Sequence, residues 1–147
     1  MVYKYQKVYR IIYLSSAIDS VDETGLEYLL VKSRAKNIAN DITGILLHID
    51  GDFIQVLEGD KEKVINLYEK IGKDIRHRGL INVSEGEVEK RQFNDWSMSY
   101  KSTNYSEINK IEGLKEFNRD ALFSNNDKIA LTFLRVFLKS HKNHINI

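Results

Sequence analysis

Three polar side chains in otherwise apolar surroundings are the residues of this chain best suited to bind a ligand or to do chemistry. Tyr13 lies in a β-branched and aromatic run, Gln55 sits between two apolar residues, and Asn37 ends an apolar stripe. A buried amide without a hydrogen-bond partner costs about 1–3 kcal/mol, so something must bond Gln55. A phenol and two amides beside an apolar slot suit a flat heteroaromatic ligand with alternating donors and acceptors.

Each of these residues also has a structural explanation. A core glutamine can be satisfied by backbone or by a neighbouring tyrosine, and asparagine is common at helix C-termini. Buried tyrosines usually anchor their hydroxyl to an acceptor. The structural explanation therefore stays open for each residue alone, and the ligand hypothesis depends on all three pointing into one layer.

The chain has few features of an enzyme. It contains no GxGxxG, GxxxxGK[ST], HExxH or GxSxG motif, so dinucleotide-fold, P-loop, zincin and hydrolase functions lack their sequence signatures. The absence of cysteine excludes thiolate metal sites and cysteinyl–flavin chemistry. Only His141 and His144 are at metal-ligand spacing, close to the end of the chain, so no metal is expected.

Composition favours a single soluble domain. The 147 residues carry 22 basic and 21 acidic side chains, a net charge of +1, which argues against nucleic-acid or anionic-membrane partners. The longest apolar segment, 129–138, is far shorter than the ~20 residues of a membrane span. Residues 1–7 are polar and do not form a signal peptide. We therefore expect a cytoplasmic protein.

Apolar periodicity predicts five strands and two helices before residue 102. The Asp50-Gly51 pair between two strand-like runs is a strong hairpin signal, and Asp60 is placed to cap the second helix. The expected elements are a strand over 8–14, a helix with an apolar stripe from Leu26 to Asn37, strands over 41–49 and 52–58, a helix with a stripe from Val64 to Ile71, and strands over 80–88 and 96–101.

This order predicts an α+β fold, the ferredoxin-like βαββαββ sandwich, with two helices on one face of an antiparallel sheet. A further helix is expected over 127–141. It should cover the other face, because Ile12 and Leu14 point opposite to Ile11 and Tyr13. The alternative is that the C-terminal helices form a partner-binding or dimer surface. We divide the chain into a domain over 1–102 and a helical extension over 103–147.

Over roughly residues 8–100 the sequence resembles the BLUF domain, a blue-light sensor that uses FAD. The resemblance is carried by RIIYLSSA (10–17), KNIANDITGILLHIDGDFIQVLEGD (36–60), KDIRHRG (73–79) and RQFNDWSMSY (91–100). The spacing and order of these segments agree with the family throughout, and their combination is highly specific.

The resemblance implies a role for each candidate residue. Tyr13 matches the tyrosine that donates an electron to the photoexcited flavin, and Gln55 the glutamine between that phenol and the N5/O4 edge. Asn37 matches the asparagine that binds the pyrimidine-like edge of the ring. The ring would lie between two helices, near Leu29 and Ile71, with Trp96 and Met98 on the last strand near the glutamine. The further candidate cofactor contacts are Lys36, Lys70, Arg76 and His77. FAD is the implied cofactor, and FMN and riboflavin stay open because all three share the isoalloxazine ring.

The implied mechanism is photochemical, not enzymatic. Light drives an electron and a proton from Tyr13 through Gln55, which ends rotated or tautomerised, with a new hydrogen bond to the flavin and a small red shift. The last strand and the C-terminal helices would be the readout element. We expect a stand-alone photoreceptor that signals to an unidentified protein partner, because about 45 residues after the sensor are too few for a cyclase or a DNA-binding domain.

Two alternatives belong to other classes, a small flavin redox enzyme and an acylphosphatase-like hydrolase on the same fold. The first lacks a nicotinamide-binding feature, and the second lacks a phosphate-cradling loop because residues 15–19 contain no glycine or basic residue. The apolar segment 129–138 and the habit of the family suggest a homodimer or larger oligomer.

Three positions depart from the family. Asp41 stands where glycine is frequent, so the turn there is expected to differ. Lys36 replaces the more usual histidine, arginine or asparagine and is a candidate contact for the ribityl or phosphate part of the cofactor. His48 replaces a frequent tyrosine. None of these departures removes the Tyr13, Asn37 and Gln55 set, so photoactivity is predicted to be intact.

Overall fold

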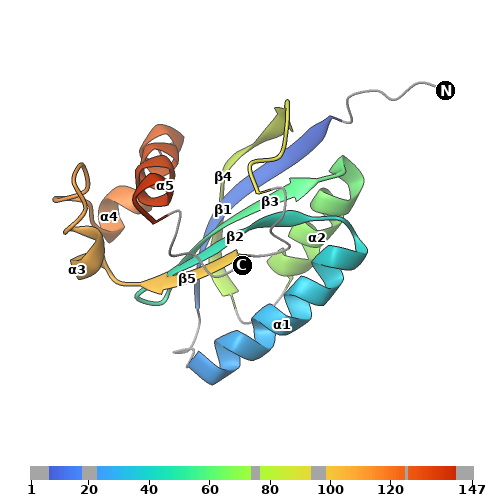
Figure 1. Cartoon of the computed structure of the whole chain (residues 1–147), viewed down its shortest axis with the longest axis horizontal. Coiled ribbons are helices and arrows are strands. Elements are labelled where there is room, and N and C mark those ends of the chain that lie inside the picture. The colour runs from blue at the N-terminus through green and yellow to red at the C-terminus, as the bar shows by residue number, and fades with distance from the viewer. Residues whose placement is uncertain (1–6, 18–22, 74–76, 94–98, 125, 142–147) are drawn as a thin grey trace.

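The computed structural model describes residues 7–17, 23–73, 77–93, 99–124 and 126–141, without the side chains of 17, 23–27, 29, 77–79 and 141. The predicted order of elements is confirmed (Figure 1). The elements are β1 (Val8–Ala17), α1 (Glu23–Ala39), β2 (Thr43–Ile49), β3 (Asp52–Gly59), α2 (Lys61–Gly72), β4 (His77–Val88), β5 (Ser99–Thr103), α3 (Tyr105–Ile108), α4 (Arg119–Leu122) and α5 (Asp127–His141).

The five strands form one sheet in the order β4-β1-β3-β2-β5. β1 is antiparallel to both β3 and β4, and β2 is antiparallel to β3. β5 is parallel to β2, so the prediction of a purely antiparallel sheet is wrong at this edge. The reason is the route of the chain, because β5 is reached from β4 on the opposite edge, and such a crossover, unlike a hairpin, allows a parallel pair.

Local sequence signals explain the hairpin and the start of α2. Asp50 and Gly51 both have positive φ, 51° and 90°, which is the conformation that a two-residue type I′ turn requires. The Asp60 carboxylate accepts a hydrogen bond from the Lys63 N–H at 3.3 Å and so caps α2. The predicted hairpin and cap are confirmed.

The sheet has an apolar cluster on each face, as the alternation along β1 predicts. Ile11 and Tyr13 pack in one cluster, which includes Leu30 of α1 and Val64 of α2. Ile12 and Leu14 belong to the other cluster, under α3, α4 and α5. Figure 1 shows α1 and α2 on one side of the sheet and the C-terminal helices on the other.

α5 has the bounds predicted from the sequence and packs on the sheet. Its side chains Phe133 and Phe137 are buried, and the ring of Phe117 stacks on Phe133 with centroids 4.4 Å apart. The apolar residues that motivated the expectation of a dimer are therefore engaged largely within the chain itself.

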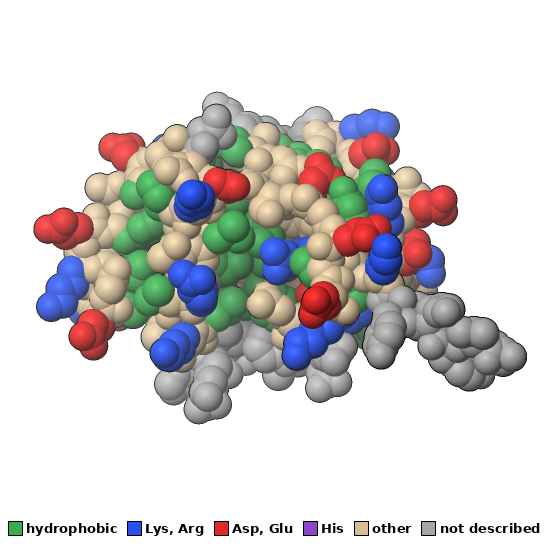
Figure 2. Space-filling model, turned by 90° about the horizontal axis from the view of Figure 1, so that it is seen from above, with side chains coloured by type: hydrophobic (Ala, Val, Ile, Leu, Met, Phe, Trp, Pro, Cys, Tyr) green, Lys and Arg blue, Asp and Glu red, His purple; other side chains and the backbone are tan. Residues whose placement is uncertain are grey.

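On the face shown in Figure 2, Lys and Arg side chains are interspersed with Asp and Glu around patches of apolar atoms. Within the described ranges, no helix has both the length and the apolar composition of a membrane-spanning segment.

Candidate functional site

Tyr13 and Gln55 face each other in the centre of the sheet. They are directly opposite in the β1–β3 ladder, and the Tyr13 hydroxyl donates a hydrogen bond to Oε1 of Gln55. Tyr13 is 1 % exposed, whereas Gln55 is partly buried and not fully buried as its sequence context suggested. The structure thus joins the phenol and the amide that the sequence singled out separately.

The surroundings of Tyr13 keep its phenol neutral. Burial raises the pKa of Tyr13 far above that of an ordinary tyrosine. The ring of Tyr68 on α2 meets it edge to face, with centroids 5.3 Å apart and an interplanar angle of 65°. Tyr68 was predicted as part of the α2 stripe but not as a site residue. Its aromatic character at a core-facing position was the only sequence signal for this contact.

Asn37 is 2 % exposed and lies inside α1, two residues before the helix ends. The helix is closed by other groups. The Asn40 side chain donates to the Lys36 carbonyl at 2.9 Å, and Asp41 turns the chain with φ of 53°. The groups that close the helix thus include the Asn40 side chain and the turn at Asp41.

Apolar side chains surround the phenol and the amides. A buried cluster encloses Tyr13. It contains Leu30 of α1, Val64 of α2 and Ile42, which lies just before β2, and Ile71 of α2 packs against it as expected. α2 packs on β1 and β3, and α1 reaches the same cluster through Leu30. A phenol, two amides and an apolar wall match the flat shape and alternating donors and acceptors of an isoalloxazine ring.

The two candidate lysines, Lys36 near the end of α1 and Lys70 near the end of α2, lie toward opposite ends of the helix layer. α1 ends shortly before Thr43, and α2 begins shortly after Glu58. Because Thr43 and Glu58 are paired across β2 and β3, the end of α1 and the start of α2 lie at the same edge of the layer. The helices therefore run in opposite directions. Lys70 is nine residues into α2, about 13 Å from its start at 1.5 Å per residue, and both lysines are exposed. The backbone positions of the two lysines are therefore separated along the helix layer.

Several candidate residues lie outside what the structure describes. Arg76, Trp96 and Met98 fall in the undescribed ranges, and the side chains of Leu29 and His77 are not described either.

Comparison with known proteins identifies the family. The model of a family described as sensors of blue-light using FAD matches residues 8–99, more than half of the chain. The chain belongs to the BLUF family. BLUF domains bind a flavin and sense blue light, so the resemblance noted from the sequence is confirmed, and neither enzymatic alternative is favoured.

Similar proteins include parts of much longer ones. The chain is 33% identical over 88 residues to the photoactivated adenylate cyclase subunit beta of Euglena gracilis, which is 59% of this chain and 10% of that protein. To subunit alpha of the same organism it is 35% identical over 81 residues, 55% of this chain and 8% of that protein. The chain thus spans about a tenth of the length of these relatives.

Solved structures of BLUF proteins confirm the fold. The ground-state structure of BlsA is 29% identical, with a TM-score of 0.74, over 87% of this chain and 85% of that one. The dark-state structure of the BLUF protein BlrB gives a TM-score of 0.70 at 24% identity, over 93% of this chain and 99% of that one. The α+β, ferredoxin-like architecture is therefore that of the family.

Proposed function

We propose that this chain is a blue-light photoreceptor in which Tyr13 supplies an electron and a proton. The Gln55 amide then keeps an altered hydrogen-bonding arrangement as the light state. The observation that carries this proposal is the bond from the buried Tyr13 phenol to Oε1 of Gln55. It gives the proton a defined acceptor atom in a place from which water is largely excluded.

When bound, the flavin supplies a ring that absorbs blue light and then oxidises a nearby donor. The raised pKa of Tyr13 keeps the proton on the phenol in the dark. A phenol that has lost an electron is a strong acid, so its proton moves along the existing bond to Oε1 of Gln55. The electron and one proton then return to Tyr13. If that proton comes from Oε1, the amide keeps its form and ends rotated; if it comes from Nε2, the proton left on Oε1 makes the amide its imidic tautomer. A carboxamide has two near-equivalent hydrogen-bonding settings, so either end state can be held.

The residues proposed to hold the ring divide into polar and apolar groups. The Asn37 amide would bond the pyrimidine-like edge, and Ile71, together with Leu29, would form the apolar sandwich. Trp96 and Met98 are proposed to lie near the amide of Gln55. The proposed contacts to the rest of the cofactor are Lys36, Lys70, Arg76 and His77.

FAD is the proposed form of the flavin because the family is named for it. FMN and riboflavin carry the same ring, so ring contacts do not discriminate among the three. Chromatography of the flavin released from denatured protein identifies the form. A release of FMN or riboflavin alone would contradict the FAD assignment without affecting the photochemistry.

Absorption spectra before and after a blue flash test the photochemistry. The wild-type chain should show a flavin spectrum that shifts slightly to the red and recovers in the dark. Tyr13→Phe and Gln55→Ala should stay yellow but give no red-shifted product. Tyr68→Phe is the matched control, since it also removes a phenol hydroxyl next to the site but leaves the Tyr13–Gln55 bond. Normal photocycling of Tyr13→Phe would contradict the proposal.

We further propose that the signal passes to a protein partner and that the chain forms a homodimer or larger assembly. BLUF segments of the Euglena relatives are parts of proteins named as photoactivated cyclases, which supports coupling to an effector. Size-exclusion chromatography with light scattering, in darkness and in blue light, tests the assembly. A clean monomer in both states would contradict it.

A further inference from the structure

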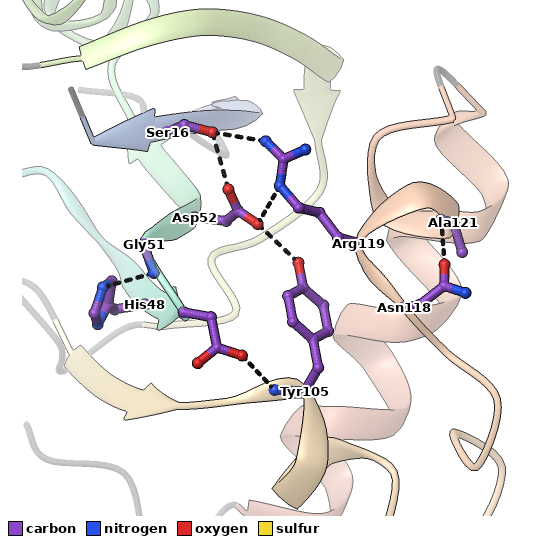
Figure 3. Close-up of polar contacts among 9 residues, drawn as sticks. Ser16, His48, Gly51, Asp52, Tyr105, Asn118, Arg119 and Ala121 are labelled. Carbon is purple, nitrogen blue, oxygen red and sulfur yellow. Dashed lines mark hydrogen bonds and ion pairs between the residues drawn. The ribbon is translucent and has the colours of Figure 1, made fainter. Parts of the chain in front are cut away.

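Asp52 connects the sheet to the C-terminal segment through a compact set of hydrogen bonds (Figure 3). Its carboxylate, only 5% exposed, accepts from the Ser16 hydroxyl at 2.9 Å, the Tyr105 hydroxyl at 3.0 Å and Arg119 Nε at 2.8 Å. Arg119 Nη2 also donates to the Ser16 hydroxyl at 3.3 Å. We call these four residues the Asp52 joint.

The joint ties four separate elements together, since its residues come from β3, β1, α3 and α4. The β2–β3 hairpin holds α3 at a second point, because Asp50 accepts from the Tyr105 backbone N–H at 2.9 Å. The Asp52 carboxylate is buried although Arg119 is half-exposed, so a placement that withdraws its donors leaves a buried charge without partners, which is costly. The joint therefore favours one defined placement of α3 and α4 against the sheet.

The joint also lies on the two strands that carry the candidate site. Ser16 and Asp52 are directly opposite in the same β1–β3 ladder as Tyr13 and Gln55. The two pairs are three residues apart, about 10 Å along the strands. Because three is odd, they lie on opposite faces, the site under α1 and α2 and the joint under the C-terminal helices.

We propose that Asp52 is a positioning residue through which the state of the Tyr13–Gln55 pair and the placement of residues 105–122 bias each other. This inference rests on the proposed function. A change in the β1–β3 ladder at Gln55 alters the spacing of Ser16 and Asp52, and with it the fit of Tyr105 and Arg119. Coupling free energies between two sites are reciprocal, so a weakened joint must change the free energy of the light state relative to the dark state. We expect the lifetime of the light state to report this change.

The first test compares dark recovery after a blue flash. Arg119→Gln breaks the ion pair with Asp52, and Arg135→Gln is the matched control because it removes the same charge from an exposed position on α5. Arg119→Gln should change the recovery rate clearly beyond any difference between Arg135→Gln and the wild type. Arg135→Gln should recover as the wild type does. Both should keep the red shift, because neither arginine touches Tyr13 or Gln55.

The second test measures amide hydrogen exchange over residues 105–122 in darkness and under continuous blue light. The wild type and Arg135→Gln should show a light–dark difference there, and Arg119→Gln should lose most of it. Tyr105→Phe removes one bond of the joint but keeps the ring, so it serves if Arg119→Gln folds poorly, and it should act in the same direction.

The outcomes separate the two levels of the proposal. Suppose that Arg119→Gln and Tyr105→Phe keep a normal red shift and show the same recovery rate and the same hydrogen exchange as Arg135→Gln. That result would overturn the role of Asp52 and leave the proposed photochemistry intact. Absence of a red shift in the flavin-loaded wild type would overturn the proposed function and, with it, the coupling that rests on it.

Discussion

Glu58 is a fully buried carboxylate at the end of β3, held by donors from two distant parts of the chain. It accepts from the Thr43 hydroxyl at 2.8 Å and from the backbone N–H groups of Gln92 and Phe93 at 3.0 and 2.6 Å. The three donors converge on the two oxygens of this one side chain. Glu58 thereby fixes the segment after β4 against the start of β2.

Glu58→Gln should lower the free energy of unfolding by about 2–3 kcal/mol, because an amide presents its NH₂ group to a donor and leaves a buried bond unmade. Chemical denaturation measures this change. Glu89→Gln, at an exposed position just after β4, is the matched control and should stay within about 0.5 kcal/mol of the wild type. Equal effects of the two substitutions would show that the Glu58 bonds contribute little.

Asn37→Ala should weaken flavin binding by up to about tenfold, the equivalent of one net hydrogen bond. Asn40→Ala is the control, since it removes an amide three residues away that caps the carbonyl of Lys36. It should leave the dissociation constant nearly unchanged. Titration of flavin fluorescence measures both constants. If both variants bind flavin equally well, Asn37 has no role in the site.

Residue-level prediction succeeded where it followed strand periodicity. The alternation along two strands was enough to place Tyr13 and Gln55 in the layer under α1 and α2. It did not pair them with each other, because the register of β1 against β3 is tertiary information. The Tyr68 contact was missed because it depends on how α2 sits on the sheet, which residue spacing does not encode. The Asp52–Arg119 bond was missed because it joins residues 67 positions apart in the sequence.

At the scale of elements, the turn after α1 explains a departure from the family. Asp41 takes φ of 53° where glycine is frequent. The N–H of Ile42 bonds the Asn37 carbonyl at 2.8 Å and that of Asp41 bonds Ile38 at 3.2 Å, which is the Schellman pattern. The ion pair of Asp41 with Arg91 at 3.1 Å involves a carboxylate that is 82% exposed, so it contributes little.

Substitution at Asp41 should therefore follow backbone conformation and not charge. Asp41→Gly should raise the free energy of unfolding by about 0.5–1 kcal/mol, because glycine adopts positive φ without steric cost. Asp41→Val should lower it by about 1–2 kcal/mol, because a β-branched residue is strained in the left-handed region. Denaturant midpoints measure both. Loss of stability in both variants would instead assign the stabilisation to the Arg91 pair.

His48 links β2, β5 and the hairpin turn in its neutral form. Its Nε2 accepts from the Gly51 N–H at 3.1 Å, so the proton is on Nδ1, 3.0 Å from the Ser102 hydroxyl. Burial lowers the pKa of His48, an effect that Asp50 and Asp52 partly oppose. The unfolded chain therefore takes up the proton first as pH falls.

His48 should contribute fully to the free energy of unfolding above its pKa in the unfolded chain, about 6.5. That contribution should decrease as the pH falls from there to the lower pKa of His48 in the folded chain. His48→Gln should remove this decrease and flatten the dependence of unfolding free energy on pH between about 7 and 5. Denaturation at a series of pH values measures the two slopes. Identical slopes would contradict the assignment.

Element boundaries were predictable where apolar residues set them. α5 was placed correctly by its stripe, whereas β4 begins at His77, earlier than the expected residue 80. The added residues are polar or glycine, and their strand conformation comes from pairing with β1, where Ser16 faces Arg78. Pairing partners of this kind are tertiary information, as is the parallel placement of β5.

At the scale of the whole molecule, one sheet serves as the wall of two cores. The predicted division into residues 1–102 and 103–147 assigns the C-terminal helices to a separate part. Yet the cluster on their face mixes sheet residues such as Ile45 and Ile54 with Phe133 and Phe137 of α5. Neither the sheet nor the C-terminal helices can bury these residues without the other, so we expect the chain to unfold as one cooperative unit.

Phe133→Ala tests this cooperativity from the face opposite the flavin. Phe133 is 1% exposed, and its truncation should lower the free energy of unfolding by about 3–5 kcal/mol. In one cooperative unit, visible circular dichroism of bound flavin and far-ultraviolet circular dichroism must report the same transition, and the substitution must shift both midpoints together. A helical transition that moves to lower denaturant while the flavin signal keeps its wild-type midpoint would show that residues 103–147 unfold independently. In that case the coupling assigned to Asp52 would have to act between two separately stable parts.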